Sequence, residues 1–183
     1  MLRILARLSR CKRDRRCVSA VEFAFIAPVM IGLYLGCVEI SDGVAADRKV
    51  SLVVDTLANL ASEVTTLSTG DMTNILNASS AIISPYSTAN LTATVSCISI
   101  DKNGAATVAW SQATANGVPR ATGSSIVIPA ALANPSSQLL LGEASYVYKP
   151  IVGYTITGSV TLSDKMYMAP RISAATYNGT ACS

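Results

Sequence analysis

The feature that most constrains this chain is an apolar run close to its N-terminus. From Val18 to Val38 the sequence has 21 residues with one charged side chain, Glu22. At about 1.5 Å of rise per residue, a helix of that length covers about 30 Å, the thickness of the hydrocarbon core of a bilayer. We interpret residues 18–40 as a transmembrane helix. The alternative, a buried core helix, fits the flanking charges less well.

Charged residues are distributed unevenly around this run. Residues 1–17 hold seven of the chain's 14 basic side chains and one of its 11 acidic ones, whereas Glu39, Asp42 and Asp47 follow the run. The positive-inside rule therefore predicts a cytoplasmic leader over 1–17 and an exported domain over 41–183. A basic run also occurs in nucleic-acid arms, but beside an apolar segment it favours a membrane, and we expect no nucleic-acid partner.

No second segment of comparable length and apolarity follows, so the sequence predicts a single span. An alternative is cleavage by conventional signal peptidase after Val-Ala-Ala at 44–46. That site implies a leader far longer than usual, with Pro28 inside its apolar region.

Beyond the span the apolar residues take up helical spacing, typical of a helix that covers a core on one side. With no proline between Val29 and Ser84, we expect one helix over roughly 18–66, with Gly43 as a possible break and Gly70 as its stop signal. A second short helix is predicted over 72–83. The residues of the predicted core stripe are Val50, Val53, Val54, Leu57, Leu60, Ala61 and Val64.

From Leu91 the pattern changes to that of β-strands. Two alternating segments flank Asp-Lys-Asn-Gly at 101–104, which predicts a hairpin. Further strands are expected at 139–154, interrupted by Pro150, and at 158–171; residues 124–132 are expected to be extended and the tail irregular. The fold class is therefore α+β: a long membrane-spanning helix with an amphipathic half packed on an antiparallel sheet of about four strands.

Five cysteines and no histidine bear on chemistry. Only Cys97 and Cys182 lie clearly within the exported part, where the compartment is oxidising, so we predict a disulfide between them; two unpaired buried thiols are the alternative. The absence of histidine removes the commonest general base and metal ligand. Asp-Lys-Asn-Gly lacks the continuation of a calcium loop. We find no catalytic, metal or cofactor motif, and expect neither an enzyme nor a small-molecule substrate.

Small residues recur every four positions along the span, at Ala20, Ala24, Pro28, Gly32 and Gly36. Gly32 and Gly36 form a Gly-x-x-x-Gly pattern, which allows helices to pack closely in lipid. Pro28 removes one backbone hydrogen bond, so we expect a kink there.

The basic leader followed by SAVEFAFIAPVMIGLYLGCVEI resembles the start of type IV pilin-like precursors, and more narrowly the TadE-like family of tight-adherence (Flp) pilus systems. The segment EASYVYKPIVG, followed by VTLSDKMYMAPR, is similar to that family's C-terminal pattern. The resemblance implies a pilin-like pseudopilin or minor pilin in a bacterial inner membrane, with a periplasmic domain and an association with surface pili. It also implies three partners: membrane lipid, other pilus subunits and a prepilin peptidase.

The resemblance further implies cleavage between Cys17 and Val18, which makes Glu22 the fifth residue of the mature chain; the family usually has glycine where this chain has Cys17. The Glu22 carboxylate would then neutralise the new ammonium at Val18 of a neighbouring subunit. The alternative for Glu22 is an interfacial residue that snorkels to headgroups. The alternative for the protein is a membrane-anchored binding or adhesion module unrelated to pili, with an uncut N-terminus.

Overall fold

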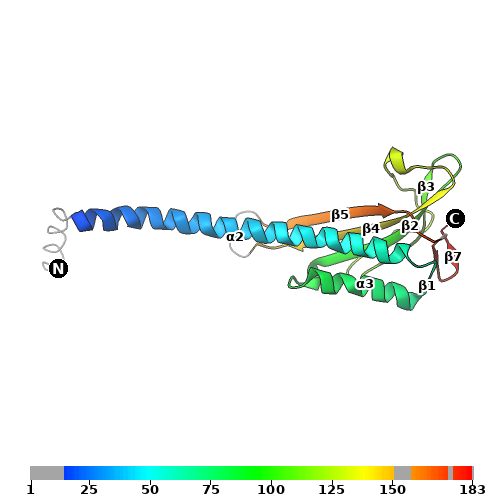
Figure 1. Cartoon of the computed structure of the whole chain (residues 1–183), viewed down its shortest axis with the longest axis horizontal. Coiled ribbons are helices and arrows are strands. Elements are labelled where there is room, and N and C mark those ends of the chain that lie inside the picture. Colours follow the sequence, from blue (N-terminus) through cyan, green and yellow to red (C-terminus); the bar gives the residue numbers. More distant parts are fainter. Residues whose placement is uncertain (1–14, 151–157, 173–174, 183) are drawn as a thin grey trace.

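The computed structural model describes residues 15–150, 158–172 and 175–182, with side chains from Val18 onward. Most of the basic leader and the end of the third predicted strand lie outside the described residues. A single long helix, α2 (Arg15–Ser62), dominates the shape: its N-terminal half extends alone, and its C-terminal half lies against a domain (Figure 1). The predicted α+β arrangement is confirmed.

Helix α2 contains 48 residues and continues without interruption through Pro28 and Gly43, so the possible break at Gly43 was wrong. The kink at Pro28 stays a prediction. The helix ends at Ser62, where the carbonyl oxygen accepts a hydrogen bond from the Arg171 backbone N–H at 3.1 Å. Val64, which was expected in the core stripe, lies beyond the helix and is exposed.

Helix α3 (Thr69–Ile83) begins with a capping box. The Ser68 hydroxyl accepts the Asp71 backbone N–H at 3.2 Å, while the Asp71 carboxylate accepts the Ser68 N–H at 3.0 Å. The Ser68 hydroxyl also donates to the Asp71 carboxylate at 2.7 Å, and this bond, followed by that from the Ser68 N–H, lowers the pKa of Asp71. Gly70 therefore lies in the first turn of a new helix and does not stop the preceding one, because the cap outweighs the glycine.

The far end of α3 is fixed by a side chain from α2. The Lys49 ammonium donates to the carbonyl oxygens of Ile82 at 3.0 Å and Ser84 at 2.6 Å. A cation at this position satisfies carbonyls that have no partner within the helix and is favoured by the helix dipole. The two helices are thereby tied together side by side.

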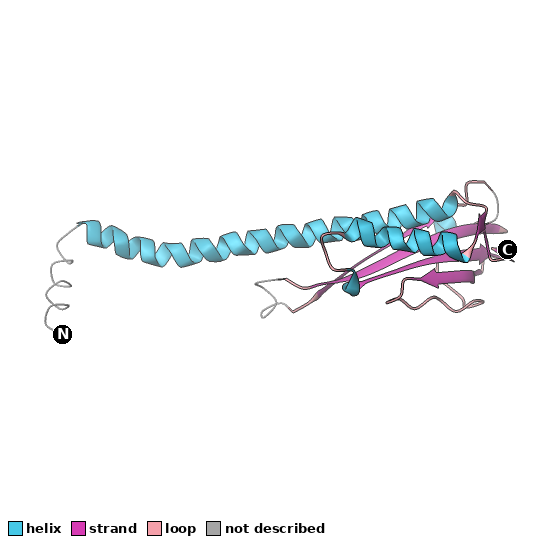
Figure 2. Ribbon diagram, turned by 90° about the horizontal axis from the view of Figure 1, so that it is seen from below, coloured by secondary structure: helices cyan, strands magenta, loops and turns pink. Residues whose placement is uncertain are grey.

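Four antiparallel strands form the main sheet, in the order β3-β2-β4-β5. They are β2 (Leu91–Ile100), β3 (Ala106–Ala113), β4 (Ser137–Tyr148) and β5 (Val160–Met168). The hairpin of β2 and β3 is confirmed, and β4 ends before Pro150. Figure 2 shows the helices on one side of the sheet.

The main core lies between α2, α3 and this sheet. Gly142 on β4 allows the close approach, since an added Cβ would lie 3.0 Å from the Val54 carbonyl oxygen and 3.3 Å from Ala58 Cβ. The buried residues of α2, each at most 1 % exposed, are Ala46, Val50, Val53, Val54, Leu57, Ala58 and Ala61.

A smaller cluster covers part of the opposite face of the sheet. Ile126, Ile128 and Leu132 pack there against buried residues that include Leu141. The segment that carries them was expected to be extended over 124–132. It forms one bridge, between Thr107 and Ser125, and a short 3-10 helix, η2 (Ala130–Leu132).

The C-terminal tail was expected to be irregular, and this expectation was wrong. The tail forms two short strands, β6 (Thr176–Tyr177) and β7 (Thr180–Ala181). With β1 (Thr66–Leu67) they make a second sheet in the order β1-β6-β7. Asn178 and Gly179 both have positive φ, of 46° and 81°, which forms the tight turn between β6 and β7.

Candidate assembly helix and its anchor points

The N-terminal half of α2, from Val18 to Asp42, is exposed nearly all round. Among the described residues, α2 alone is long and apolar enough to cross a membrane by length and composition, and none of its most apolar stretch is buried. A core helix of a soluble protein would be buried on at least one side, so the helix suggests a membrane anchor. Its exposed large apolar side chains include Phe23, Phe25, Ile26, Val29, Ile31, Leu33 and Tyr34.

The predicted cleavage site and Glu22 both lie at the start of this helix. The Cys17–Val18 peptide bond is within the first turn of α2, where helix ends fray most readily. Glu22 is exposed and lies four residues after Val18, so the two residues share one face of the helix. A carboxylate here is the single acidic group on an apolar surface that extends to Val38.

Gly32 and Gly36 lie one turn apart in the same exposed half. A Cβ added at either position would meet no heavy atom within 4 Å. Packing within the described residues therefore does not require glycine at either position. The helix of another chain could approach this surface closely.

The domain begins directly where the apolar run ends. The Tyr86 hydroxyl donates to the Asp42 carbonyl oxygen at 3.1 Å, and the rings of Tyr86, Tyr146 and Tyr148 form a tyrosine cluster with centroid distances of 6.1 and 6.5 Å. Burial raises the pKa of Tyr86 and of Tyr148, and the nearby Asp42 carboxylate raises both further. No free linker separates the exposed helix from the domain.

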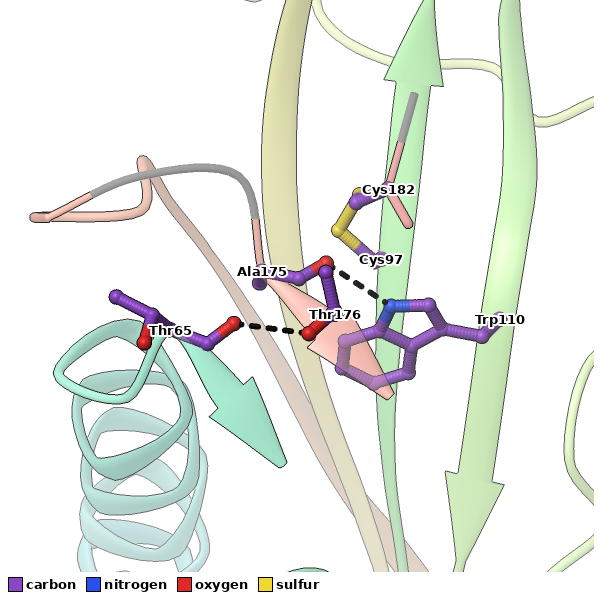
Figure 3. Close-up of a disulfide and its surroundings, with 6 residues drawn as sticks. All are labelled: Thr65, Cys97, Trp110, Ala175, Thr176 and Cys182. Atoms are coloured by element: carbon purple, nitrogen blue, oxygen red, sulfur yellow. Dashed lines mark hydrogen bonds between the residues drawn. A yellow bond between two sulfur atoms is a disulfide. The ribbon is translucent and has the colours of Figure 1, made fainter. Parts of the chain in front are cut away.

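The structure brings Cys97 and Cys182 together at the opposite end of the domain. A disulfide joins them, with 5.9 Å between Cα atoms, and neither residue is exposed. Figure 3 shows the indole N–H of Trp110 donating to the Ala175 carbonyl oxygen beside this bridge, at 3.4 Å. The tail is therefore attached to β2 covalently and to β3 through Trp110.

The Arg171 guanidinium bonds Asn59 Oδ1 and pairs with the Glu63 carboxylate at 3.5 Å, while its backbone N–H bonds Ser62. Arg171 thus caps the C-terminal end of α2, where a cation is favoured. The sequence pattern contained Arg171 but gave it no role. Lys49 and Gly142 were missed altogether; a glycine inside a predicted strand was the available signal.

Residues 18–58 match the family model described as TadE-like protein. The match lies within α2 and confirms the resemblance to that family over the helix. No curated protein and no solved structure matches the chain. The TadE-like family implies involvement in the assembly of tight-adherence (Flp) pili, as a structural, non-enzymatic kind of protein that works with other pilus components.

Proposed function

We propose that this protein is a pseudopilin-like subunit, or minor pilin, of a tight-adherence pilus assembly or secretion system. Residues 18–40 anchor it in the bacterial inner membrane, with residues 1–17 in the cytoplasm and residues 41–183 in the periplasm. The observation that supports this most is one helix, matched by the TadE-like family, whose first half is apolar and exposed and whose second half is buried in a domain.

The exposed half of α2 suits a subunit that leaves the membrane. In a bilayer, lipid tails cover its apolar side chains. Outside the bilayer the same surface is far larger than soluble proteins leave uncovered, so it requires the helices of neighbouring subunits. Gly32 and Gly36 provide a face on which such helices pack closely.

Glu22 sets the register of that packing. Prepilin peptidase cuts between Cys17 and Val18, and the new ammonium lies on an apolar surface where charges are poorly solvated. Opposite charges about 4 Å apart attract by about 1 kcal/mol in water and more in a less polar environment, but desolvation offsets much of the gain. The pair therefore contributes more to alignment than to net affinity.

Two measurements test the proposal in cells that express an active pilus system. Mass spectrometry of the mature protein should find Val18 as the first residue, and Cys17→Gly should speed the cut. A protein that still begins at Met1 contradicts processing and favours the membrane-anchored adhesion module.

The second measurement is co-purification of Glu22→Gln with other pilus subunits. This variant keeps the shape of the side chain but cannot neutralise an amine. We expect normal insertion, an unchanged thermal transition of the domain, and roughly tenfold less co-purification, which corresponds to about 1.4 kcal/mol. Asp47→Asn, on the same helix beyond the span, is the matched control. If Glu22→Gln assembles like wild type, snorkelling to headgroups is the better account of Glu22.

A further inference from the structure

The two edges of the four-stranded sheet differ. The outer edge of β3 is closed by the segment that follows it. Val108 N–H donates to the Ser124 carbonyl oxygen at 3.0 Å, Gly123 N–H to that of Val108 at 2.7 Å, and Ile126 N–H to that of Ala106 at 3.0 Å. On the outer side of β5, at the other edge, the described residues include no such backbone cover.

The register shows which backbone groups of the sheet face each way. Ala93 on β2 bonds Thr114 through both its N–H and its carbonyl oxygen, so Ala93 faces the β3 side. Successive residues of a strand direct these groups to opposite sides. Thr94 therefore faces β4, and so its partner Glu143 faces β2.

The same alternation continues to the edge. Ala144, the next residue of β4, faces β5, where it pairs with Asp164. The backbone of Asp164 therefore faces inward and that of Lys165 faces the open edge. The outward-facing residues of β5 are Thr161, Ser163, Lys165 and Tyr167.

Asp164 blocks the middle of this edge. Its carboxylate accepts the outward Lys165 N–H at 2.8 Å and the Ser51 hydroxyl of α2 at 2.5 Å. Natural edge strands are commonly protected by proline, bulges or charges. Strand β5 has no proline between 160 and 168, and its pairing with β4 has no register shift. Among the described residues, protection of β5 thus rests on two charged side chains: Asp164, which covers the outward Lys165 N–H, and Lys165 itself.

A groove of about 420 Å³ lies beside the edge, between α2 and β5, and its lining includes Asp55, Met166 and Met168. Asp55 is one helical turn beyond Ser51, which bonds Asp164, so both carboxylates lie on this flank. Neither carboxylate forms a salt bridge with any described residue. The flank therefore combines apolar methionine surface with negative charge that has no cationic partner among the described residues.

We propose that β5 is a strand-accepting edge for an extended segment of a different polypeptide, one that carries a lysine or arginine between apolar residues on its α2-facing side. The incoming cation pairs with the Asp164 carboxylate and moves it away from the Lys165 N–H. The Lys165 N–H is then free to bond the backbone of the incoming segment. Backbone hydrogen bonds supply affinity, and the cation supplies selectivity. The inference extends beyond pilus assembly and does not depend on Glu22 or on cleavage.

A second copy of this chain fits the edge poorly. Asp164 contacts Ser51, while Met168 lies near Asn59, so β5 runs in the same direction as α2. Two copies inserted the same way in one membrane would place their β5 strands in parallel. A twofold axis between the two strands, parallel to them, would place each outward-facing residue directly opposite the same residue of the other copy. N–H groups would then face N–H groups and carbonyls would face carbonyls, whereas in a parallel ladder the bonding residues of the two strands are offset.

The test uses the full chain in lipid nanodiscs and a synthetic peptide as long as β5, of alternating valine and threonine with lysine at the centre of the valine face. Alternate N-methylation prevents the peptide from pairing with itself. Amide exchange measured by NMR should slow at Ser163 and Lys165 and stay unchanged at Leu162, whose N–H faces β4. A peptide with central glutamate should bind at least tenfold more weakly.

Two variants complete the test. Ser163→Pro removes an outward N–H but no rung of the β4–β5 ladder, so it should keep the thermal transition and lose peptide binding. Asp164→Ala should speed exchange at Lys165 and abolish the preference for lysine, whereas the control Asp47→Asn changes neither.

Three results overturn the proposal: no protection of Ser163 at millimolar peptide, equal binding of both peptides to wild type, or protection that grows with protein concentration alone, which would identify a second copy as the occupant.

Discussion

The two halves of α2 share one continuous backbone but have opposite surroundings. From Val18 to Val38 the helix is apolar on all sides apart from Glu22 and is almost fully exposed, whereas from Ala46 to Ser62 one side is buried against the sheet. The difference follows from side-chain spacing, because an all-round apolar helix needs a non-aqueous environment and a one-sided helix needs only a core. The first half of the helix therefore suits a membrane anchor, and the second half forms part of the core of the domain.

This division separates the energies of the two halves. Burial of the second half stabilises the domain itself, while the first half gains stabilisation only from lipid or from other chains. Substitutions in the second half should change the free energy of unfolding. Substitutions in the first half should change insertion or assembly and leave unfolding unaffected.

The largest expected effect on the free energy of unfolding comes from the disulfide between Cys97 and Cys182. Replacing both Cys97 and Cys182 by alanine should lower the free energy of unfolding by about 4 kcal/mol, because the bridge joins residues separated by 85 positions. Denaturant unfolding with and without reductant measures the loss. Cys37→Ala, in the exposed half, is the control and should show none. Free thiols at both positions in protein purified without reductant would contradict the expectation.

A matched pair of leucines tests the division directly. Leu57 is 0 % exposed and Leu33 is 62 % exposed on the same helix. Leu57→Ala should cost about 3 kcal/mol of unfolding free energy, through lost burial and a cavity, and Leu33→Ala close to nothing. Thermal and denaturant unfolding in micelles compare the two. Equal losses would mean that the first half of α2 also packs within the chain.

The parts of this fold that repeat locally were predictable from sequence. Spacing in α2 and α3 and alternation in β2, β3 and β5 depend on neighbours within a few residues, so they mark the elements. The strands β6 and β7 are too short for any period, and β6 pairs with β1 more than 100 positions away. Gly70 misled because propensity is a weak prior, which the Ser68–Asp71 cap overrode.

The candidate sites divide in the same way. Glu22, Gly32 and Gly36 attract attention because their residue types are unusual or patterned within an apolar run. Lys49 and Arg171 resemble ordinary surface cations in sequence, since their roles depend on which helix end lies nearby. The contact between the Asp164 carboxylate and the Lys165 N–H could not be predicted as protection of a sheet edge, because sequence alone does not reveal that β5 is an edge strand.

A smaller loss of unfolding free energy is expected where α2 and β4 pack closely at Gly142. Gly142→Ala places a Cβ 3.0 Å from the Val54 carbonyl oxygen, a backbone atom that moves only with the helix. We expect a loss of about 1–3 kcal/mol from overpacking, measured by denaturant unfolding. Gly36→Ala, where the added Cβ meets nothing within 4 Å, is the control. Unchanged stability in Gly142→Ala would show that the contact yields at little cost.

The smallest effect concerns the tyrosine cluster at the junction of the two halves. Burial, with the Asp42 carboxylate, holds the pKa of Tyr86 and Tyr148 above their ordinary value near 10. Above about pH 10 the unfolded chain therefore loses these protons before the folded chain does, and stability falls as pH rises through the folded pKa. Below pH 10 the phenols are neutral in both states and add no pH dependence.

Unfolding followed between pH 9 and 11 should show this fall in wild type and a shallower one in the variant with Tyr86→Phe and Tyr148→Phe. Tyr34→Phe, in the exposed half, should follow wild type. The effect is small because Tyr86 is only half-buried. If the double variant keeps the full slope, the alkaline sensitivity belongs to other groups, and the junction contributes packing without a titrating contact. A shallower slope in Tyr34→Phe would instead assign part of the alkaline sensitivity to the exposed half of α2 and contradict the division between the halves.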